Sequence, residues 1–490
     1  MISAGYSDQQ GIIPSTDYER YNLRVNTTSK LTSWLKLDVN MAYLNSTQEE
    51  SAAGAAEAYR RTMRALPYLP VQFSDGTYSY DAAPSNPVRM VNGDYGMRRK
   101  NNDCMTLLIA PEINILDGLN IRGTFGYESN IYKEKIFNKT VTYGSFEPAG
   151  QSGLTEVSRN KQTDRWDQYR NLTANVTASY EKTIGKHDFK VMAGGSLETF
   201  KWAYTKASRM DFPNDDFGEI NAGDATTAAA EGNSTYSALA SLFGRANYVY
   251  ADRYLFEFTA RYDGSSKFGA DNRWAVFPAF SLGWRIKNEP FLENVDFLSD
   301  LKLRFSWGRN GNSAIPSGYL QSSYVADYNG TSYAMNGQES GSLQSGFRKY
   351  LTGNSTLKWE TVTQTNYGID FGFFNQSLVG TIDYFYKKTT DMLYLPPYIG
   401  AFGEGGDTYV NGPSMENRGV EILLTYRNSL PSGFNYSITG NIATFKNKIT
   451  ELPDNVRSVY GGNGMLDDII GRPRNSIYGL SLIHISEPTR

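Results

Sequence analysis

The stretch Tyr254-Leu-Phe-Glu-Phe-Thr-Ala-Arg-Tyr262 alternates apolar and polar side chains over nine residues. Every second residue from Tyr254 is aromatic or alanine, whereas the positions between them include Glu257 and Arg261. A period of two is typical of a β-strand whose two faces meet different surroundings. A shift by one residue would place both charges on the apolar side, and an Arg near the middle of a bilayer costs about 2–4 kcal/mol. The stretch therefore predicts a strand with one face toward hydrocarbon and one toward water.

The same alternation recurs along the chain, in about fourteen candidate strands between Tyr21 and Asn447. The clearest examples are residues 35–43, 119–127, 172–180, 242–248, 301–307, 365–371, 420–426 and 434–440. Nine residues at about 3.3 Å each, tilted by about 45°, reach about 21 Å, close to the apolar band of an outer-membrane barrel at roughly 25 Å. Alternation also fits a soluble sandwich, so a second criterion is needed.

The connections between the candidate strands alternate between short and long. Short links join 180 to 188, 250 to 254, 374 to 378 and 427 to 434. Long links occupy 45–102, 129–166, 201–236, 308–356 and 388–417. Short turns on one rim and long loops on the other are typical of outer-membrane barrels, with the short turns periplasmic. The link at 287–300 is longer than the other short ones, and the pattern does not explain it.

Aromatic residues cluster where strands meet the short turns, as expected of side chains at the lipid headgroup boundary. We expect six of them to face lipid or to form a girdle: Tyr248, Tyr250, Tyr254, Phe256, Phe258 and Phe371. The alternative is that they pack inside a soluble barrel. Eight charged residues are expected on the opposite, lumen-facing side: Arg122, Arg245, Glu257, Arg261, Arg285, Arg304, Asp370 and Asp383. They could pair to stiffen the wall or contact a plug or passing solute.

Composition excludes several function classes. A net charge of −3 gives no basic surface for nucleic acid. The single cysteine, Cys104, allows neither an internal disulfide nor a paired-thiol zinc motif. His187 and His484 are far apart in the sequence, which removes most histidine-based catalytic or metal sites. No stretch approaches the roughly 18 uncharged apolar residues of a membrane helix. We expect no catalytic residue, cofactor or metal, and no enzyme activity.

Three local segments have competing interpretations. Residues 214–224 offer oxygen ligands for Ca²⁺ but lack the spacing of a calcium-binding helix-loop-helix, so a solvated acidic loop is the alternative. Gly403-Glu-Gly-Gly406 could suggest a phosphate cradle, yet no strand-then-helix context follows it, which favours a loop tip. Residues 49–65 are rich in helix formers and are stopped by Pro67, which predicts a helix that packs on the extracellular side.

A series of motifs runs through the chain in a fixed order. They are Arg261-Tyr-Asp-Gly-Ser-Ser-Lys-Phe-Gly269, Asn272-Arg-Trp-Ala-Val-Phe-Pro278, Ser281-Leu-Gly-Trp284, Leu301-Lys-Leu-Arg-Phe-Ser-Trp-Gly-Arg-Asn-Gly-Asn312, Leu357-Lys-Trp-Glu-Thr-Val-Thr-Gln-Thr-Asn366, Asp383-Tyr-Phe-Tyr-Lys-Lys-Thr-Thr-Asp391 and Asn417-Arg-Gly-Val-Glu421. Their order and spacing resemble the SusC/RagA family of TonB-linked outer-membrane transporters of Bacteroidetes-type bacteria. The resemblance covers residues from about 17 to 480.

The resemblance implies an all-β fold, a transmembrane antiparallel barrel of 22 strands with long extracellular loops. It also implies an amino-terminal plug, a segment that engages TonB, and a SusD-type lipoprotein lid over glycan or peptide cargo. We expect neither a signal peptide, a plug nor a TonB-engaging segment before residue 17, and we expect the closing strands to be absent. We therefore expect residues 1–480 to be an incomplete barrel region. Residues 481–490 resemble translated sequencing adaptor and are expected to be a non-native tail.

The expected function is active import of oligosaccharides or peptides across the cell outer membrane. A TonB-dependent siderophore or vitamin receptor is one alternative. Another is a secreted, soluble β-rich glycan-binding protein, which would need polar residues on both sheet faces or a second packed sheet.

Overall fold

The computed structural model describes residues 1–68, 70–74, 76–79, 86–144, 154–216, 218–326, 332–333, 344–396, 408–453, 469–474 and 476. The chain divides into two compact units. Unit 1 comprises Met1–Asn114, Arg122–Val176 and Leu197–Ser237, and unit 2 comprises Ile115–Ile121, Thr177–Ser196 and Ala238–Arg490. The segments 403–406 and 481–490 lie outside the described residues.

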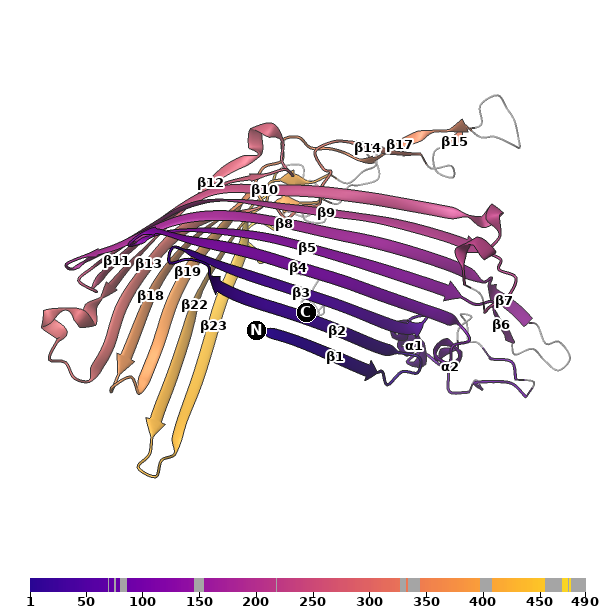
Figure 1. Ribbon diagram of the computed structural model, residues 1–490, viewed down its shortest axis with the longest axis horizontal. Helices are drawn as coiled ribbons and strands as arrows, with labels where there is room; N and C mark the ends of the chain where they lie inside the picture. Colours follow the sequence, from indigo (N-terminus) through magenta and orange to yellow (C-terminus); the bar gives the residue numbers. More distant parts are fainter. Residues whose placement is uncertain are drawn as a thin grey trace, which may run out of the picture. The chain divides into compact units, whose positions relative to one another are not determined.

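The main structural element is a sheet of fifteen strands in the order β1-β2-β3-β4-β5-β8-β9-β10-β11-β12-β13-β18-β19-β22-β23 (Figure 1). The first seven are β1 (Ile2–Gln10), β2 (Asp17–Lys30), β3 (Leu35–Ser51), β4 (Gly96–Leu116), β5 (Leu119–Asn138), β8 (Lys161–Ile184) and β9 (His187–Met210). The other eight are β10 (Ala229–Tyr250), β11 (Tyr254–Ser265), β12 (Trp274–Arg285), β13 (Leu298–Asn312), β18 (Glu360–Phe373), β19 (Leu378–Thr390), β22 (Ser414–Ser429) and β23 (Asn435–Glu451). Sequence neighbours are sheet neighbours, and their pairing is antiparallel, as in β10–β11–β12.

The predicted strands are confirmed, and the sheet contains one strand more. Fourteen of its fifteen strands, β2 to β23, account for the candidates between Tyr21 and Asn447. The fifteenth, β1, has the sequence Ile-Ser-Ala-Gly-Tyr-Ser-Asp-Gln-Gln. Apolar side chains alternate only over Ile2, Ala4 and Tyr6 before the sequence becomes polar, and the strand pairs with β2 along its whole length. Backbone pairing therefore extends this strand beyond its short alternation.

The asymmetry of the connections is also confirmed. At one end the strands are joined by 31–34, 117–118, 185–186, 251–253, 286–297, 374–377 and 430–434, which we call the short-turn rim. At the other end the main connections are 52–95, 139–160, 211–228, 313–359 and 391–413, with two brief ones at 11–16 and 266–273. The long connections are shorter than predicted because the strands extend into them. Both β8 and β9 have 24 residues.

Small elements lie within the long connections. The two-stranded sheets are β6 (Val141–Gly144) with β7 (Leu154–Ser158), β14 (Ser323–Ala326) with β17 (Phe347–Leu351), β15 (Ser332–Tyr333) with β16 (Gln344–Ser345), and β20 (Leu393–Tyr394) with β21 (Val410–Asn411). Short 3-10 turns occupy Ile220–Ala222, Ala225–Thr227 and Ala270–Asn272.

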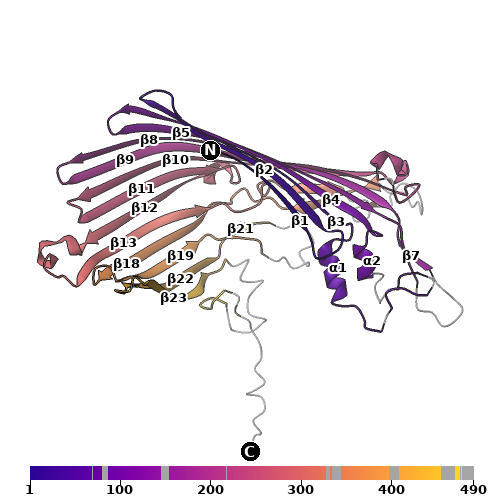
Figure 2. The same ribbon diagram turned by 60° about the horizontal axis from the view of Figure 1, so that its bottom comes forward.

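The helix predicted over residues 49–65 is shorter than expected. Helix α1 covers Ala55–Thr62, and residues 49–51 belong to β3 instead. Glu50 ends this strand, where its carboxylate accepts hydrogen bonds from Lys100 (2.6 Å) and from the backbone N–H of Ala55 (3.2 Å). Pairing with β4 thus outweighs helix propensity. A second helix, α2 (Pro87–Val91), lies beside α1 (Figure 2). No helix among the described residues is long and apolar enough to span a bilayer.

A small hydrophobic core anchors the long connections of unit 2, and we call it the loop core. Its buried members are Phe268, Phe277, Ile315, Leu357 and Trp359. They come from the connection after β11, from β12, from the connection after β13 and from the segment before β18. Trp359 packs against the rings of Phe268 (5.2 Å) and Phe277 (5.4 Å) and donates a hydrogen bond to the carbonyl of Arg273 (3.0 Å). The motifs at 261–269, 272–278 and 357–366 therefore meet in one cluster.

Candidate functional site

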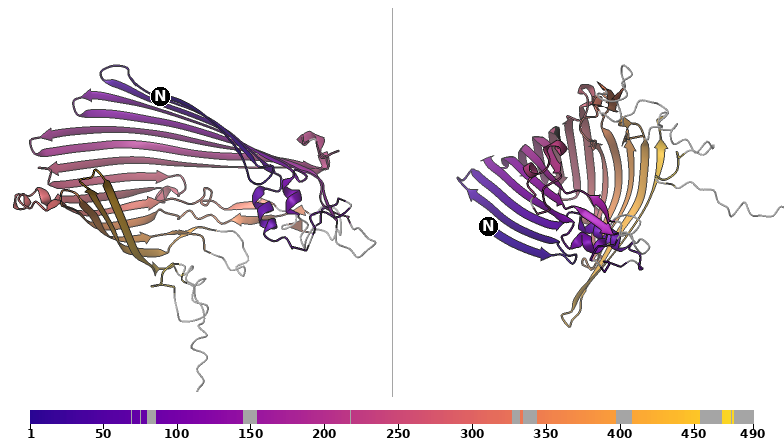
Figure 3. Two further views of the ribbon diagram at one scale, coloured as in Figure 1. Left: turned by 90° about the horizontal axis from the view of Figure 1, so that it is seen from below. Right: turned by 90° about the vertical axis from the view of Figure 1, so that its right-hand side faces the viewer.

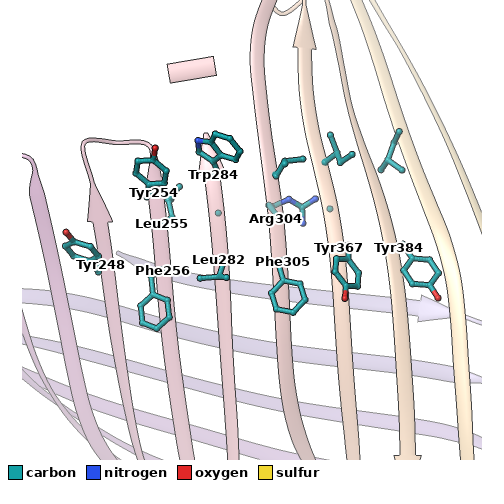
Figure 4. A pocket seen from close by; sticks show the side chains of 15 residues that line it. Tyr248, Tyr254, Leu255, Phe256, Leu282, Trp284, Arg304, Phe305, Tyr367 and Tyr384 are labelled. Atoms are coloured by element: carbon teal, nitrogen blue, oxygen red, sulfur yellow. The ribbon is translucent and has the colours of Figure 1, made fainter. Parts of the chain in front are cut away.

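One face of the sheet in unit 2 carries large apolar side chains in rows across neighbouring strands, and we call it the aromatic face. One row, in register order, is Tyr248, Phe256, Leu282, Phe305, Tyr367 and Tyr384. The row nearer the short turns is Tyr250, Tyr254, Trp284, Leu303, Ile369 and Ile382. Figure 4 shows Tyr254 and Trp284 nearest the turn and the rings of Phe256, Phe305 and Tyr367 side by side below them. Together they line a hollow of about 840 Å³.

The aromatic face leaves these side chains exposed. Tyr254, Phe256 and Phe258 are 45%, 41% and 43% exposed, and Tyr367 is 54% exposed. All six residues expected to face lipid or to form a girdle lie here, because Tyr248, Tyr250 and Phe371 share the side-chain parity of these rows. A soluble domain seldom exposes so large a contiguous apolar surface unless something covers it.

The opposite side of the same strands, the polar face, centres on an ion-pair cluster. Arg304 on β13 donates two hydrogen bonds of 2.8 Å to the carboxylate of Asp370 on β18, and one of 3.1 Å to Asp383 on β19. Gly368 lies directly beneath this cluster, where a β-carbon would approach the Arg304 guanidinium carbon to 2.6 Å. The cluster joins three consecutive strands, and its members are partly buried.

The remaining predicted charges of unit 2 are distributed along the polar face. Arg261 pairs with Asp263 on its own strand (3.1 Å), and its guanidinium lies 5.1 Å from the Phe243 ring centre. Glu257 accepts a hydrogen bond of 2.5 Å from Asn247. Arg245 is exposed and lies across from Thr259. Arg285 forms an ion pair with Asp252 in the turn, so it belongs to the short-turn rim rather than to the middle of the wall.

Arg122 belongs to unit 1 and has its own network. It donates to Glu112 (2.8 Å) and to Asp38 (3.2 Å), and Lys36 lies 3.6 Å from both of these carboxylates. The eight charges therefore do not form one site. Arg304 and Arg122 each join neighbouring strands, Arg285 joins a strand to its turn, and Arg261 pairs within its own strand.

The link over residues 286–297, which we call the rim link, is the feature that the sequence pattern did not explain. It contains two 3-10 turns, Ile286–Asn288 and Pro290–Leu292 (Figure 3). Between them Glu289 is 7% exposed and accepts hydrogen bonds from the Tyr254 hydroxyl (2.6 Å) and the Trp284 indole N–H (3.0 Å). Arg253 lies 3.3 Å away. These hydrogen bonds, above all that from Tyr254, lower the pKa of Glu289. A buried carboxylate held by two girdle aromatics thus fixes the link.

The acidic stretch 214–224 has separate partners for its carboxylates. Asp215 accepts hydrogen bonds from the backbone of Thr140 (3.1 Å) and from Asn160 (3.0 Å), and Glu219 pairs with Lys135 (3.0 Å). Asp224 caps its own turn through Thr226, which lowers the pKa of that carboxyl. Within the described ranges, no group of three or more His, Cys, Asp or Glu side chains is arranged to hold a metal ion.

His187 lies against the aromatic face at the short-turn rim. Its Nδ1 is 2.8 Å from the Tyr248 hydroxyl, and its ring centre is 4.9 Å from that of Tyr250. This contact could not be predicted from the sequence, because His187 and the two tyrosines come from different strands.

The chain is similar to known proteins in sequence. A family model described as TonB dependent receptor-like, beta-barrel matches residues 61–481. The chain is 28% identical to the TonB-dependent receptor SusC of Bacteroides thetaiotaomicron over 478 residues, which cover 92% of this chain and 45% of that protein. It is also 28% identical to the TonB-dependent receptor P3 of Formosa agariphila, with coverage of 92% and 44%. The chain thus spans less than half the length of these relatives.

Solved structures show the same fold. The RagAB peptide importer in its closed-closed state matches with a TM-score of 0.75 at 22% identity, over 92% of this chain and 49% of that one. The ferripyoverdine receptor of the outer membrane of Pseudomonas aeruginosa matches less closely, with a TM-score of 0.52 at 12% identity over 92% and 52%. Both likenesses concern the fold alone. The match of the family model over most of the chain shows that this chain belongs to the TonB-dependent receptor-like β-barrel family.

Proposed function

We propose that this chain forms part of the barrel wall of an outer-membrane transporter that imports oligosaccharides or peptides with energy supplied through TonB. The observation that carries the proposal is the two-faced wall of unit 2: exposed aromatic side chains on one face and paired charges on the other. Such a sheet fits between lipid and a water-filled lumen. Two relatives in sequence are TonB-dependent receptors, and one structural relative is a peptide importer.

In this proposal the aromatic face meets lipid, and Arg245, Glu257, Arg261, Arg304, Asp370 and Asp383 face the lumen of unit 2. Arg122 does so in unit 1, and Arg285 braces the short-turn rim. Residues 1–480 belong to the barrel region. A plug, a TonB-engaging segment and a SusD-like lipoprotein lid complete the transporter. Each lumen-facing cluster is locally paired, so its main role is to stiffen the wall.

Deletion of the complete gene in its host tests the proposal. The mutant and its complemented strain are grown on a panel of defined oligosaccharides and oligopeptides, each as sole carbon or nitrogen source. We expect the deletion to abolish growth on at least one of them, and loss of TonB to produce the same defect. A defect confined to iron limitation would favour a siderophore receptor instead. Recovery of the protein in the soluble secreted fraction would overturn membrane transport altogether.

The lid is tested by affinity purification of the full-length protein from detergent-solubilised outer membranes. We expect a lipoprotein to co-purify in stoichiometric amount. Its absence would contradict the lid while leaving the growth test unaffected.

A further inference from the structure

The rim link differs from the other short connections in length and in where it folds. It leaves β12 at Arg285 and returns to β13 at Leu298. Near its start, Glu289 bonds to Tyr254 and Trp284, which both belong to the aromatic face. At its end, the ring of Phe297 stacks on Phe373 at 6.2 Å with an interplanar angle of 5°. Phe373 shares the parity of Phe371 on that face. Both ends of the link are thus tied to the aromatic side of the rim.

Several polar groups of the link form hydrogen bonds within the protein. The Lys287 ammonium donates to the carbonyls of Leu292 and Val295, both at 3.0 Å. Asn288 donates to the carbonyl of Asp252 (3.0 Å). The backbone of the link closes on itself from Glu289 N to Ile286 O and from Leu292 N to Glu289 O. Internal pairing of this kind is what a segment needs before it can leave bulk water, because an unpaired backbone group in an apolar medium is costly.

Its aromatic side chains are exposed instead. Phe291 is 68% exposed and Phe297 is 57% exposed, which is more than any residue of the neighbouring rows quoted above. Other turns of the same rim also expose large apolar groups, among them Trp34 (51%), Phe374 (62%) and Phe434 (61%). The rim link therefore continues an apolar surface rather than interrupting one.

We propose that the rim link is a membrane-surface anchor that inserts Phe291 and Phe297 into the headgroup boundary of the periplasmic leaflet. The inference rests on the proposed function, because it takes the aromatic face as the lipid side. The exposed acidic residues Glu293 and Asp296 give the link no attraction for anionic lipid. Its partner is accordingly a zwitterionic phospholipid surface, held by aromatic insertion and not by charge.

The test uses the full-length protein reconstituted in nanodiscs of phosphatidylcholine and phosphatidylethanolamine. Cys104→Ser removes the single cysteine of residues 1–490, and any cysteine elsewhere in the full-length protein is replaced as well. Nitroxide labels are then placed one at a time through Phe291→Cys, Phe297→Cys and the matched control Glu293→Cys in the same link. Collisions with oxygen, which concentrates in lipid, and with a water-soluble nickel complex report depth. We expect at least a tenfold higher oxygen-to-nickel collision ratio at 291 and 297 than at 293. Equal ratios at 291 and 293 would overturn the anchor.

A label at Phe256→Cys separates this inference from the proposed function. If 256 reports lipid and 291 reports water, the anchor fails and the lipid-facing wall stands. If 256 also reports water or a protein interior, the wall assignment fails. Should a cysteine variant not insert, Phe291→Trp in nanodiscs of brominated phospholipid gives the same information. Additional quenching of at least one fifth relative to the parent protein is expected, and no additional quenching would contradict insertion.

Discussion

Gly368 lies under the guanidinium of Arg304, and no other side chain fits there without displacing the ion-pair cluster. Arg304 neutralises two carboxylates on the neighbouring strands β18 and β19. Its loss would leave Asp370 and Asp383 with a like-charge repulsion and unpaired oxygens.

We expect Arg304→Gln in the full-length protein to lower the free energy of unfolding by about 1–3 kcal/mol, the usual loss for a partly buried charged hydrogen-bond partner. This free energy is measured by urea unfolding in detergent micelles, with the heat-modifiable electrophoretic mobility of the barrel as the signal for the folded state. Arg304→Lys keeps the charge but not the paired hydrogen bonds, so its loss should be smaller. A Gln variant as stable as the wild type would show that the cluster contributes nothing.

The carboxylate of Glu289 makes the rim link sensitive to acid. Hydrogen bonds from Tyr254 and Trp284 hold its pKa below the ordinary value, so its contribution is fully present above about pH 4.3. The contribution is lost as the pH falls through the lowered pKa, since the carboxylate must then take up a proton. We expect amide hydrogen exchange over residues 286–297 to accelerate as the pH is lowered from 5 to 3, after correction for the intrinsic rate. Glu289→Gln should exchange faster at pH 7 and lose this extra pH dependence. Identical profiles for the two proteins would contradict the role of Glu289.

At the scale of one strand, β11 has two faces that tolerate charge differently. Phe258 lies on the aromatic face, four residues from the start of the strand, and Thr259 lies next to it on the polar face. Phe258→Arg should make the free energy of folding into phospholipid vesicles less favourable by about 2–4 kcal/mol, as for a charge deep in the apolar band. Because Thr259 lies across from Arg245, the matched control is Ser281→Arg on the polar face of β12, across from Glu257. We expect it to cost less than about 1 kcal/mol because its side chain reaches water. Comparable losses for both variants would contradict a lipid-facing side.

The loop core gives a second test at the scale of elements. Trp359→Ala removes a 7% exposed ring that packs on Phe268 and Phe277. Such a truncation usually lowers stability by about 3–5 kcal/mol. Here we expect the loss to destabilise the connection 313–359 locally. Faster cleavage of this connection by a protease, with the barrel still heat-modifiable, is the expected result. Tyr350, which is 63% exposed, supplies the control: Tyr350→Ala should leave cleavage unchanged.

The strands could be predicted from the sequence because apolar and polar residues alternate within each one, according to the two environments of its faces. About fourteen strands were predicted in this way. Pairing between distant segments leaves no such record. Alternation in β1 ends at Tyr6, so the rest of this strand forms through its hydrogen bonds to β2, and residues 49–51 extend β3 because β4 is beside them. The motifs at 261–269 and 357–366 could be recognised from the sequence, but their meeting at Trp359 depends on a separation of more than 80 residues.

The candidate site, too, could be predicted from the sequence only in part. Parity along a strand predicts which residues share a face, and the six aromatic residues do share one. Which charges touch depends on register between strands, so the division of the eight charges into separate networks could not be predicted. From the sequence, the rim link differed from the other short connections only in its length. Its structure depends on the hydrogen bond between Glu289 and Tyr254, which are more than 30 residues apart in the chain.

For the molecule as a whole, the registers of unit 2 report how far its strands tilt. One hydrogen-bonded row runs from Tyr254, the first residue of β11, to Ile442, seven residues into β23 from Asn435. Seven residues at about 3.3 Å against six strand spacings of about 4.8 Å give a tilt of about 40° to the rim. Outer-membrane barrels have tilts of about 35–45°. Solid-state infrared dichroism of the full-length protein in oriented bilayers should give this angle, and strands near the membrane normal would contradict it.

The length of β8 and β9 has a consequence for how their residues should vary among related proteins. At 24 residues and about 40° of tilt, each strand rises roughly 60 Å, more than twice the apolar band of about 25 Å. In the proposed membrane orientation, the same strand passes first through hydrocarbon and then through the external fluid. Val176 and Val191 lie nearer the short turn at 185–186, whereas Trp166 and Lys201 lie farther from it, and all four side chains are exposed. Serine or lysine should therefore be rare among related proteins at the first pair and common at the second.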